Sequence, residues 1–439
     1  MPNAIVVGAG LAGCEAALQL AYAGIEVVLY EMKPQRMSPA HRSEAFAELV
    51  CSNSLKAERE DSASGILKRE MTKLHSVVMA CAQRTRVPAG GALAVDREKF
   101  ADCVTKRIRS NPRITVVQQE ITQIPQGECV IIATGPLTDG ALAEDVARRT
   151  GQPLSFYDAA APIVSLESID MQHAFLAGRY DQPKDYLNCP LNKEEYSAFY
   201  QALMSAERAQ LHDFDLVHFE GCMPIEALAA RGFRTPLFGP MSPKGVTDPR
   251  TGRWPFALLQ LRRENEAGTM WNLVGFQTNL KFAEQKRVFG FIPALRNAEY
   301  LRYGVMHRNT YLPCGSLDGT LSLRADPRVR FAGQMTGVEG YMESAAMGIC
   351  AGLFAARTIN RQSLPQFGPQ TAMGALLQYV SGYTGNDFQP MNINFGLIAP
   401  LQEPVRGKAQ RHAALSQIAK ESFASALRAC GYEEEHTWN

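Results

Sequence analysis

The segment that most constrains the fold of this chain is its N-terminal stretch, from Met1 to Glu31. An apolar run, Ala4 to Val7, leads into Gly8-Ala9-Gly10-Leu11-Ala12-Gly13, which continues into apolar residues at helical spacing. A second apolar run, Val27 to Tyr30, ends at Glu31. This order predicts a strand, a glycine turn, a helix and a second parallel strand, which together begin a doubly wound α/β sheet.

Each glycine of this turn has a separate physical role in binding a dinucleotide. Gly8 permits the tight turn out of the strand, Gly10 has no side chain to keep a pyrophosphate from the backbone, and Gly13 lets the helix pack closely on the sheet. The unpaired N–H groups at the helix N-terminus attract the phosphates. Glu31, about 20 residues further on, is where a carboxylate would bind a ribose hydroxyl. The segment therefore predicts a dinucleotide site, with a purely structural turn as the alternative.

The composition limits the classes of protein to which the chain can belong. It has 439 residues, of which 46% are apolar and 20% charged, as in an ordinary folded protein. The formal net charge is +1, so a nucleic-acid-binding surface would require basic residues to be gathered on one face. No apolar run approaches the ~20 residues of a membrane span, and the first strand begins too near Met1 for a signal peptide. We therefore expect a cytoplasmic protein.

The chain has ten cysteines, and none forms a CxxC pair or has a histidine at zinc-like spacing. We predict no metal site and expect most thiols to be reduced and buried. Cys51 begins a polar segment directly after an apolar one, as a residue at the edge of a pocket would. Cys222 lies between Gly221 and Pro224, in a tight loop that would present its side chain, and Glu220 and Glu226 flank it. From the residues alone, an ordinary thiol is the favoured interpretation at both positions.

Strand and helix patterns alternate through the first third of the chain. One amphipathic helix is expected over residues 64–82, and another begins after Asp96, whose carboxylate can cap it. Strands are expected at residues 114–118 and 129–133. The second of these runs into Ala133-Thr134-Gly135 at the carboxyl edge of the sheet, where open α/β sheets bind ligands.

The pattern changes near Gly151, where prolines, aromatic residues and charged residues become more frequent. We predict that residues 155–308 form an α+β domain inserted into a Rossmann-like dinucleotide-binding domain. That domain would comprise residues 1–154 and 309–439, and its C-terminal tail would be helical.

A second glycine-rich turn follows the strand predicted at residues 329–332 and precedes a helix over residues 343–356. A two-part flavin fold needs such a turn, because the late helix directs its N-terminus at the pyrimidine end of the isoalloxazine ring and stabilises reduced flavin. A closely packed helix without a ligand is the alternative. The candidate cofactor residues in this turn are Gly333, Gln334, Gly337, Gly340 and Tyr341.

Seven motifs give the chain a resemblance to a known family. They are GAGLAG with Glu31, CSNSLK (51–56), PAGGALAVDREKF (88–100), ATGPLT (133–138), FEGCMPIE (219–226), AGQMTGVEGYMESAAMG (332–348) and NINFGL (392–397). Together they resemble the folate- and FAD-dependent tRNA uracil-5-methyltransferases of bacteria, the TrmFO family. The larger GidA (MnmG) flavoproteins, which modify wobble uridines with carboxymethylaminomethyl groups, share the two glycine turns.

The resemblance implies that 5,10-methylenetetrahydrofolate supplies the one-carbon unit, that reduced FAD supplies electrons, and that a T-loop uridine becomes ribothymidine. NAD(P)H would re-reduce the flavin, and the T-arm of tRNA would bind without an obligate protein partner. Uracil C5 is a poor nucleophile until a thiolate adds to C6. The resemblance assigns this chemistry to Cys222 and Cys51, and it leaves open which thiol attacks.

Folate must stack on the flavin, so we predict folate contacts from His307, Gln334 and Tyr341, although an isolated histidine is more often structural. Binding of tRNA depends on Lys and Arg contacts to phosphate. The inserted domain concentrates such residues, with an ordinary solvated surface as the alternative: Arg250, Arg253, Arg262, Arg263, Lys281, Lys286 and Arg287. Two other functions remain open, a GidA-like modifier that requires a GTPase partner and a flavoprotein that binds tRNA without methylating it.

Overall fold

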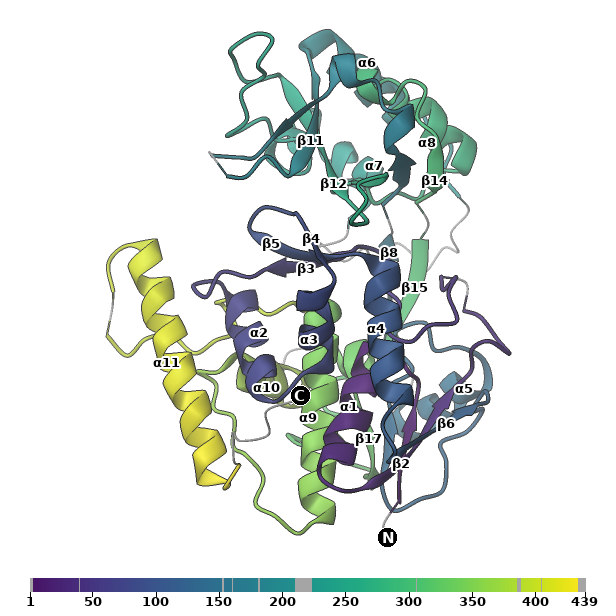
Figure 1. Cartoon of the computed structure of the whole chain (residues 1–439), viewed down its shortest axis with the longest axis vertical. Coiled ribbons are helices and arrows are strands. Elements are labelled where there is room, and N and C mark those ends of the chain that lie inside the picture. Colours follow the sequence, from purple (N-terminus) through teal and green to yellow (C-terminus); the bar gives the residue numbers. More distant parts are fainter. Residues whose placement is uncertain are drawn as a thin grey trace.

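Two bodies lie one above the other along the long axis of the molecule (Figure 1). The lower body is built on the sheet that contains strand β1 (Asn3–Val7), and the inserted body on the sheet that contains strand β12 (Ala257–Arg263). The structure is a computed structural model that describes residues 3–38, 40–151, 154–159, 161–180, 182–209, 223–304, 306–384, 388–403 and 405–432. For residues 3, 154–159 and 306–309 it describes the backbone alone.

The lower body is organised by a six-stranded sheet with the strand order β16-β17-β7-β1-β2-β6. Neighbouring strands from β17 to β6 are parallel, and the edge pair β16–β17 is antiparallel. The central strand β7 is apolar and buried throughout, as expected of a parallel strand covered on both faces. The predicted doubly wound α/β fold is therefore confirmed. The strands are β1 (Asn3–Val7), β2 (Glu26–Glu31), β6 (Ile114–Gln118), β7 (Val130–Ile132), β16 (Ser322–Leu323) and β17 (Asp326–Phe331).

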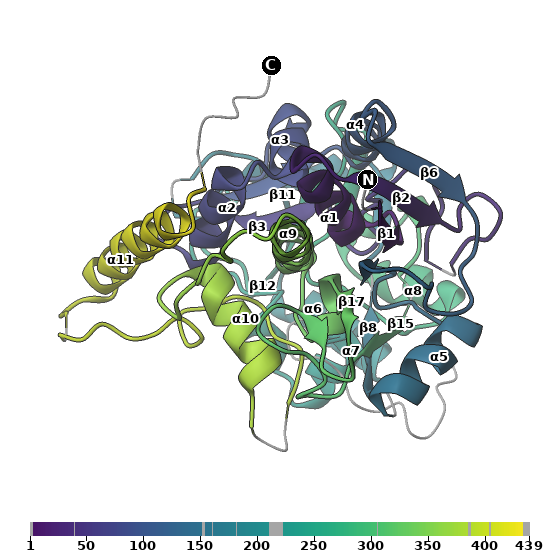
Figure 2. The same cartoon turned by 90° about the horizontal axis from the view of Figure 1, so that it is seen from below.

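Two helices, α1 and α9, lie side by side at the centre of the lower body (Figure 2). Their backbones approach closely because glycines of α9 face α1. A Cβ on Gly352 would lie 2.6 Å from the carbonyl oxygen of Ala16, and one on Gly348 would clash with the carbonyl oxygen of Ala12. The helices of this body are α1 (Leu11–Tyr22), α2 (Ala63–Lys73), α3 (Val77–Arg84), α4 (Arg97–Arg109), α5 (Gly140–Thr150), α9 (Tyr341–Ile359), α10 (Ala372–Gly382) and α11 (Lys408–Ala429).

The single helix expected over residues 64–82 is two helices in the structure, so that prediction is wrong. The chain breaks at His75, which has a φ of +57°, and Ser76 caps α3 by accepting a hydrogen bond from the Met79 N–H. The buried carboxylate of Glu15 accepts further bonds from the first turn of α3. The apolar spacing continues across the break, so the spacing alone does not reveal it. Helix α4 does begin after Asp96, whose carboxylate accepts from the Lys99 N–H as predicted.

The inserted body has its own antiparallel sheet and hydrophobic core. The strand order is β10-β11-β12-β13-β9-β14, and the core contains the fully buried rings of Tyr196, Phe199, Phe276 and Phe289. Its elements are β9 (Ile163–Ser165), η1 (Leu166–Ser168), η2 (Met171–His173), β10 (Phe175–Ala177), β11 (Tyr186–Leu191), α6 (Lys193–Met204), α7 (Ile225–Ala230), η4 (Thr235–Phe238), β12 (Ala257–Arg263), β13 (Met270–Leu273), α8 (Phe282–Phe289), η5 (Pro293–Leu295) and β14 (Tyr300–Arg302).

Two smaller sheets lie where the bodies meet (Figure 1). An antiparallel pair, β8 (Leu154–Ala159) and β15 (Met306–Tyr311), carries the chain between the bodies. A three-stranded sheet has the order β3-β5-β4, with β3 (Ser54–Ala57), β4 (Arg86–Val87) and β5 (Ala92–Val95). The boundaries proposed at residues 154/155 and 308/309 fall within the β8–β15 pair, and they stay a prediction. Within the described residues, no helix combines the length and apolarity needed to cross a bilayer.

The α1–α9 contact predicts the effect of adding one methyl group. Gly348→Ala should lower the free energy of unfolding by about 1–3 kcal/mol, because the new Cβ has no space against α1. Gly382→Ala is the matched control, since its Cβ would lie 3.9 Å from the nearest atom, in Gln378. Urea denaturation measures both, and equal unfolding midpoints for the two variants would contradict this account of the contact.

Candidate functional site

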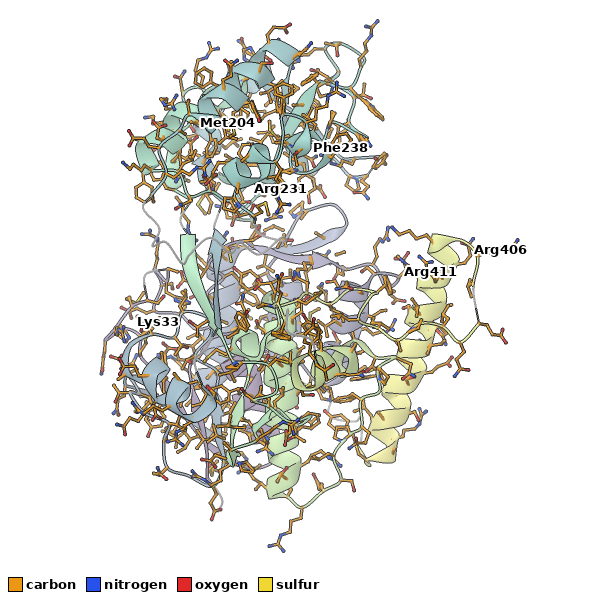
Figure 3. The ribbon with its side chains drawn as sticks, turned by 180° about the vertical axis from the view of Figure 1, so that it is seen from behind. Lys33, Met204, Arg231, Phe238, Arg406 and Arg411 are labelled. Carbon is orange, nitrogen blue, oxygen red and sulfur yellow. The ribbon has the colours of Figure 1, made fainter. Side chains whose placement is uncertain are left out.

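A pocket opens at the carboxyl ends of β1, β2 and β7, and it brings together segments that are far apart in the sequence. Both glycine turns and the Cys51 segment reach its wall. The predicted site residues that line it are Gly8, Ala9, Gly10, Leu11, Ala12, Glu31, Cys51, Ala133, Thr134, Gly135, Gly333, Gln334 and Tyr341. Lys33, which also lines it, is labelled on the lower body in Figure 3.

The first glycine turn has the geometry that a dinucleotide requires. Gly8 has a φ of +98°, and a Cβ there would lie 2.6 Å from the carbonyl oxygen of Ala133. A Cβ on Gly13 would clash with the carbonyl oxygen of Gly8, so Gly13 serves helix packing. A Cβ on Gly10 would meet no atom within 4 Å. The space beside Gly10 is therefore open to a ligand at the N-terminus of α1.

Glu31 supports the turn as well as lining the pocket. It is 6% exposed, and its carboxylate accepts hydrogen bonds from the Ala9 N–H at 2.8 Å and the Lys33 N–H at 3.0 Å. Each carboxylate oxygen can accept a further bond, so the predicted contact to a ribose hydroxyl is compatible with this arrangement. At the same pocket, Arg36 pairs with Glu120 and, at 2.8 Å, with Asp139, an ion-pair cluster that the sequence did not single out.

The second turn contributes two kinds of glycine. Gly333, at the start of η6 (Gly333–Thr336), lines the pocket, and a Cβ there would lie 3.0 Å from the Cβ of Ala12. Gly337 and Gly340 have φ angles of +99° and +108° and do not line it. At Gly337 a Cβ would meet the ring of Phe388. These two glycines therefore shape the turn that places Gln334 and Tyr341.

Tyr341, the first residue of α9, holds the Cys51 segment against the pocket. Its hydroxyl donates to the Cys51 Sγ at 3.2 Å and accepts from the backbone N–H groups of Cys51 at 2.7 Å and Ser52 at 3.2 Å. Burial raises the pKa of the Tyr341 phenol well above its usual value; the negative charge of Cys51 adds to this rise, and the Arg97 guanidinium opposes it. Tyr341 therefore stays protonated and remains a donor to the sulfur.

Two predicted residues cannot be placed. Cys222, with its neighbour Glu220, lies outside the described residues, and so does the side chain of His307. The backbone of His307, in β15, pairs with that of Asp158 in β8. Glu226 is described and is 1% exposed. Its carboxylate accepts hydrogen bonds from the Asn279 N–H at 2.6 Å and the Thr278 hydroxyl at 2.9 Å. These bonds attach α7 to the segment between β13 and α8.

The predicted tRNA-binding cations have different surroundings. Arg262 is 7% exposed and bonds to Asn53 and Ser52 of the lower body, so it does not lie on a surface, contrary to the expectation for it. The Arg263 guanidinium lies 5.6 Å from the ring centroid of Trp271. Arg253 is exposed. Three others are exposed, and each forms an ion pair with a carboxylate of its own: Arg250–Asp248, Lys281–Glu207 and Arg287–Glu284.

Arg97 and Glu264 are functional candidates that the sequence reasoning missed. Arg97 is the first residue of α4, and it forms a bidentate ion pair with Glu264 of the inserted body. A cation at a helix N-terminus is electrostatically unfavourable. Its presence directly after the capping Asp96 was a signal that Arg97 has a partner elsewhere in the fold. All nine cysteines that the structure describes are free thiols. Among all the described residues, no group of His, Cys, Asp and Glu side chains is arranged to hold a metal ion.

Comparisons with known proteins agree on one family. Residues 3–363 match the family model described as "Glucose inhibited division protein A". A protein of Pelotomaculum thermopropionicum named "Methylenetetrahydrofolate--tRNA-(uracil-5-)-methyltransferase TrmFO" is 56% identical, over 95% of this chain and 97% of its own. A protein of Listeria monocytogenes serotype 4b with the same name is 51% identical, over 94% and 96%. The solved structure of Aquifex aeolicus GidA has a similar fold, with a TM-score of 0.69 and 15% identity, over 97% of this chain and 74% of that one.

Replacing Tyr341 by Phe should slow alkylation of Cys51 by iodoacetamide at neutral pH. The variant loses the donor that stabilises the thiolate, so the midpoint of the rate against pH should move upward by about one unit, or about tenfold in rate. Tyr200→Phe is the control, because it loses a hydrogen bond to the Ala229 carbonyl in the inserted body. Peptide mass spectrometry measures alkylation at Cys51, and an unchanged profile would refute the role assigned to the phenol.

Proposed function

The chain belongs to the Glucose inhibited division protein A family and, within it, to the methyltransferases named TrmFO, and from this premise we propose that it methylates C5 of a uracil in tRNA. The observation that carries the proposal is the 51–56% identity to relatives of that name over nearly the whole chain. The pocket supports it, because two glycine turns and a thiol meet there. The one-carbon donor is 5,10-methylenetetrahydrofolate, and the product is ribothymidine in the T-loop.

The pocket fits FAD. The open space beside Gly10 suits a pyrophosphate at the N-terminus of α1, and Glu31 suits a ribose hydroxyl. The N-terminus of α9, at Tyr341, suits the electron-rich end of the ring system. FAD, when bound and reduced, supplies the electrons that convert the transferred methylene into a methyl group. NAD(P)H is the reductant that restores it.

We assign the two thiols to separate tasks. Cys222 adds to uracil C6, which makes C5 nucleophilic toward the methylene carbon, and it leaves again when the C5 proton is removed. Cys51 takes that proton, since its sulfur lies on the pocket wall next to a phenol that stabilises the thiolate. His307, Gln334 and Tyr341 contact the folate. In this assignment the uracil leaves its stack to enter the protein.

The tRNA contacts the inserted body through exposed cations. Arg250 is exposed, but its partner Asp248 has a side chain that is only 5% exposed. Arg253 is exposed, and the pairs Lys281–Glu207 and Arg287–Glu284 lie at the surface, where such pairs contribute only about 0–1 kcal/mol. Phosphates can therefore replace the carboxylates. Arg231 on this body is a further basic residue in view in Figure 3. So are Arg406 and Arg411 on the lower body, the first just before α11 and the second in its first turn. We place this reaction in the cytoplasm and assign it no obligate protein partner.

Methyl transfer by the purified chain tests the proposed function. With FAD, a reductant, tRNA and methylenetetrahydrofolate labelled in its methylene group, the label should appear in ribothymidine by mass spectrometry. Cys222→Ala should abolish transfer, and Cys314→Ala, which changes a partly exposed thiol outside the pocket, should retain it. Full activity of Cys222→Ala would refute its assignment. Binding of tRNA without transfer, or activity only with a second protein, would favour the alternative functions.

A substitution at Gly10 tests the cofactor site separately from the fold. Gly10→Val places a Cβ where no protein atom lies within 4 Å, so the fold should be retained, with the free energy of unfolding lowered by no more than about 1 kcal/mol because Gly is a better N-cap for α1 than Val. The side chain fills the space of the pyrophosphate, so FAD affinity should fall by about 100-fold, measured by titration of flavin absorbance. Gly91→Val, also in open space but outside the pocket, is the control. Retained FAD affinity in Gly10→Val would place the cofactor elsewhere.

A further inference from the structure

The two residues that precede Cys51 are held by one guanidinium group. The Nη1 atom of Arg97 donates to the carbonyl oxygen of Leu49 at 2.8 Å and to that of Val50 at 3.0 Å. The Arg97 side chain is only 14% exposed. Since buried carbonyl groups require donors, this contact fixes the backbone immediately before the thiol.

The other edge of the same guanidinium group binds the inserted body. Its Nε lies 2.6 Å from Oε2 of Glu264, and its Nη2 lies 3.2 Å from Oε1. Glu264 directly follows β12, and its side chain is 1% exposed. A bidentate pair of this kind fixes direction as well as distance. The position of Arg97 is therefore determined by the end of β12.

The residues that follow Cys51 are attached to the same end of β12. Arg262 donates to the Ser52 hydroxyl at 2.8 Å and to the Asn53 side-chain oxygen at 2.9 Å. The Asn53 amide donates in turn to the carbonyl oxygens of Arg263 at 2.8 Å and Val95 at 3.0 Å. Asn53 is fully buried. Both flanks of the thiol thus depend on one strand end of the other body.

We propose that Arg97 is a positioning residue for Cys51 and that Glu264 locks it, so that docking of the inserted sheet sets the place of the thiol in the pocket. The catalytic consequence rests on the proposed function, since it requires Cys51 to act on the bound uracil. An ordinary interdomain ion pair would stabilise the fold without affecting the thiol. The two accounts differ in what they predict for the chemistry of Cys51.

We call the Arg97–Glu264 pair the clamp. Besides holding the backbone before Cys51, the clamp places a positive charge near the thiol. Among the residues that the structure describes, the charged and titratable groups that interact with Cys51 include Tyr341 on α9, Arg97 on α4 and Arg302 on β14. Burial lowers the pKa of Arg97, but the Glu264 carboxylate more than compensates, so its net pKa is raised and it stays charged. Burial, and next the charge of Arg97, lower the pKa of Arg302. Removing the charge of Arg97 therefore withdraws a cation that favours the thiolate.

Arg97→Gln and Arg97→Lys, made in the full chain loaded with FAD, test the proposal. The first readout is the pH profile of Cys51 alkylation by iodoacetamide, which does not require methyl transfer. Arg97→Gln should move the midpoint of this profile upward by about one pH unit, which makes alkylation at neutral pH about tenfold slower. Arg97→Lys keeps the charge but cannot reproduce the planar fork, so its profile should move less. The second readout is methyl transfer, in which both variants should lower kcat with little change in KM for tRNA.

Arg328→Gln is the matched control. Like Arg97, Arg328 forms a bidentate ion pair with a carboxylate, here that of Asp326. It also donates to the backbone carbonyl of Gly127 at 2.7 Å, but it lies outside the pocket. It should lower the unfolding midpoint and leave the Cys51 profile unchanged. A wild-type profile and kcat in Arg97→Gln, or an equal shift in Arg328→Gln, would overturn the proposal. If Arg97→Gln does not fold, wild-type kcat in Arg97→Lys overturns it instead. Absence of methyl transfer in the wild type would refute the proposed function. The pH profiles of Cys51 alkylation would still show whether Arg97 positions the thiol.

Discussion

The close packing of α1 against α9 is the constraint on which the rest of the structure depends. Each helix begins at the pocket directly after a glycine turn, and the two turns touch where Gly333 faces Ala12. Because both N-termini meet at one cavity, their unpaired N–H groups place positive potential at two separate points along an extended anionic ligand. The turn before α1 suits a pyrophosphate, and the N-terminus of α9 suits a second electron-rich group of the same ligand.

The order of the elements could be predicted because the signals for it are local. Strand β6 has the bounds expected for it, residues 114–118, and α4 begins after Asp96, since alternation and capping involve neighbours in the sequence. The break at His75 could not be inferred from spacing, because the buried Glu15 of another helix completes the cap of α3. The glycine turns could also be predicted from local sequence, because each requires small residues at fixed positions.

Contacts between distant segments could not be predicted from one sequence. Arg262 and Arg253 are the same residue type in the same region, yet one is buried against the lower body and the other is exposed. The difference depends on Asn53 and Ser52, which lie about two hundred positions away in the chain and make the buried guanidinium acceptable by bonding to it. A count of basic residues therefore overstates the charge available to bind phosphate.

The location of Cys51 between the bodies has an energetic consequence for the proton transfer that we propose for it. A thiol on a free loop would have to be ordered in each catalytic cycle, and that ordering would add to the activation free energy. Here the backbone on both sides of the thiol is bonded to buried groups of β12 and α4, and the sulfur itself is bonded to α9. The ordering is therefore completed when the two bodies pack together during folding. The inserted sheet, which shares no strand with the parallel sheet, thus acts on the pocket through a rigid polar contact.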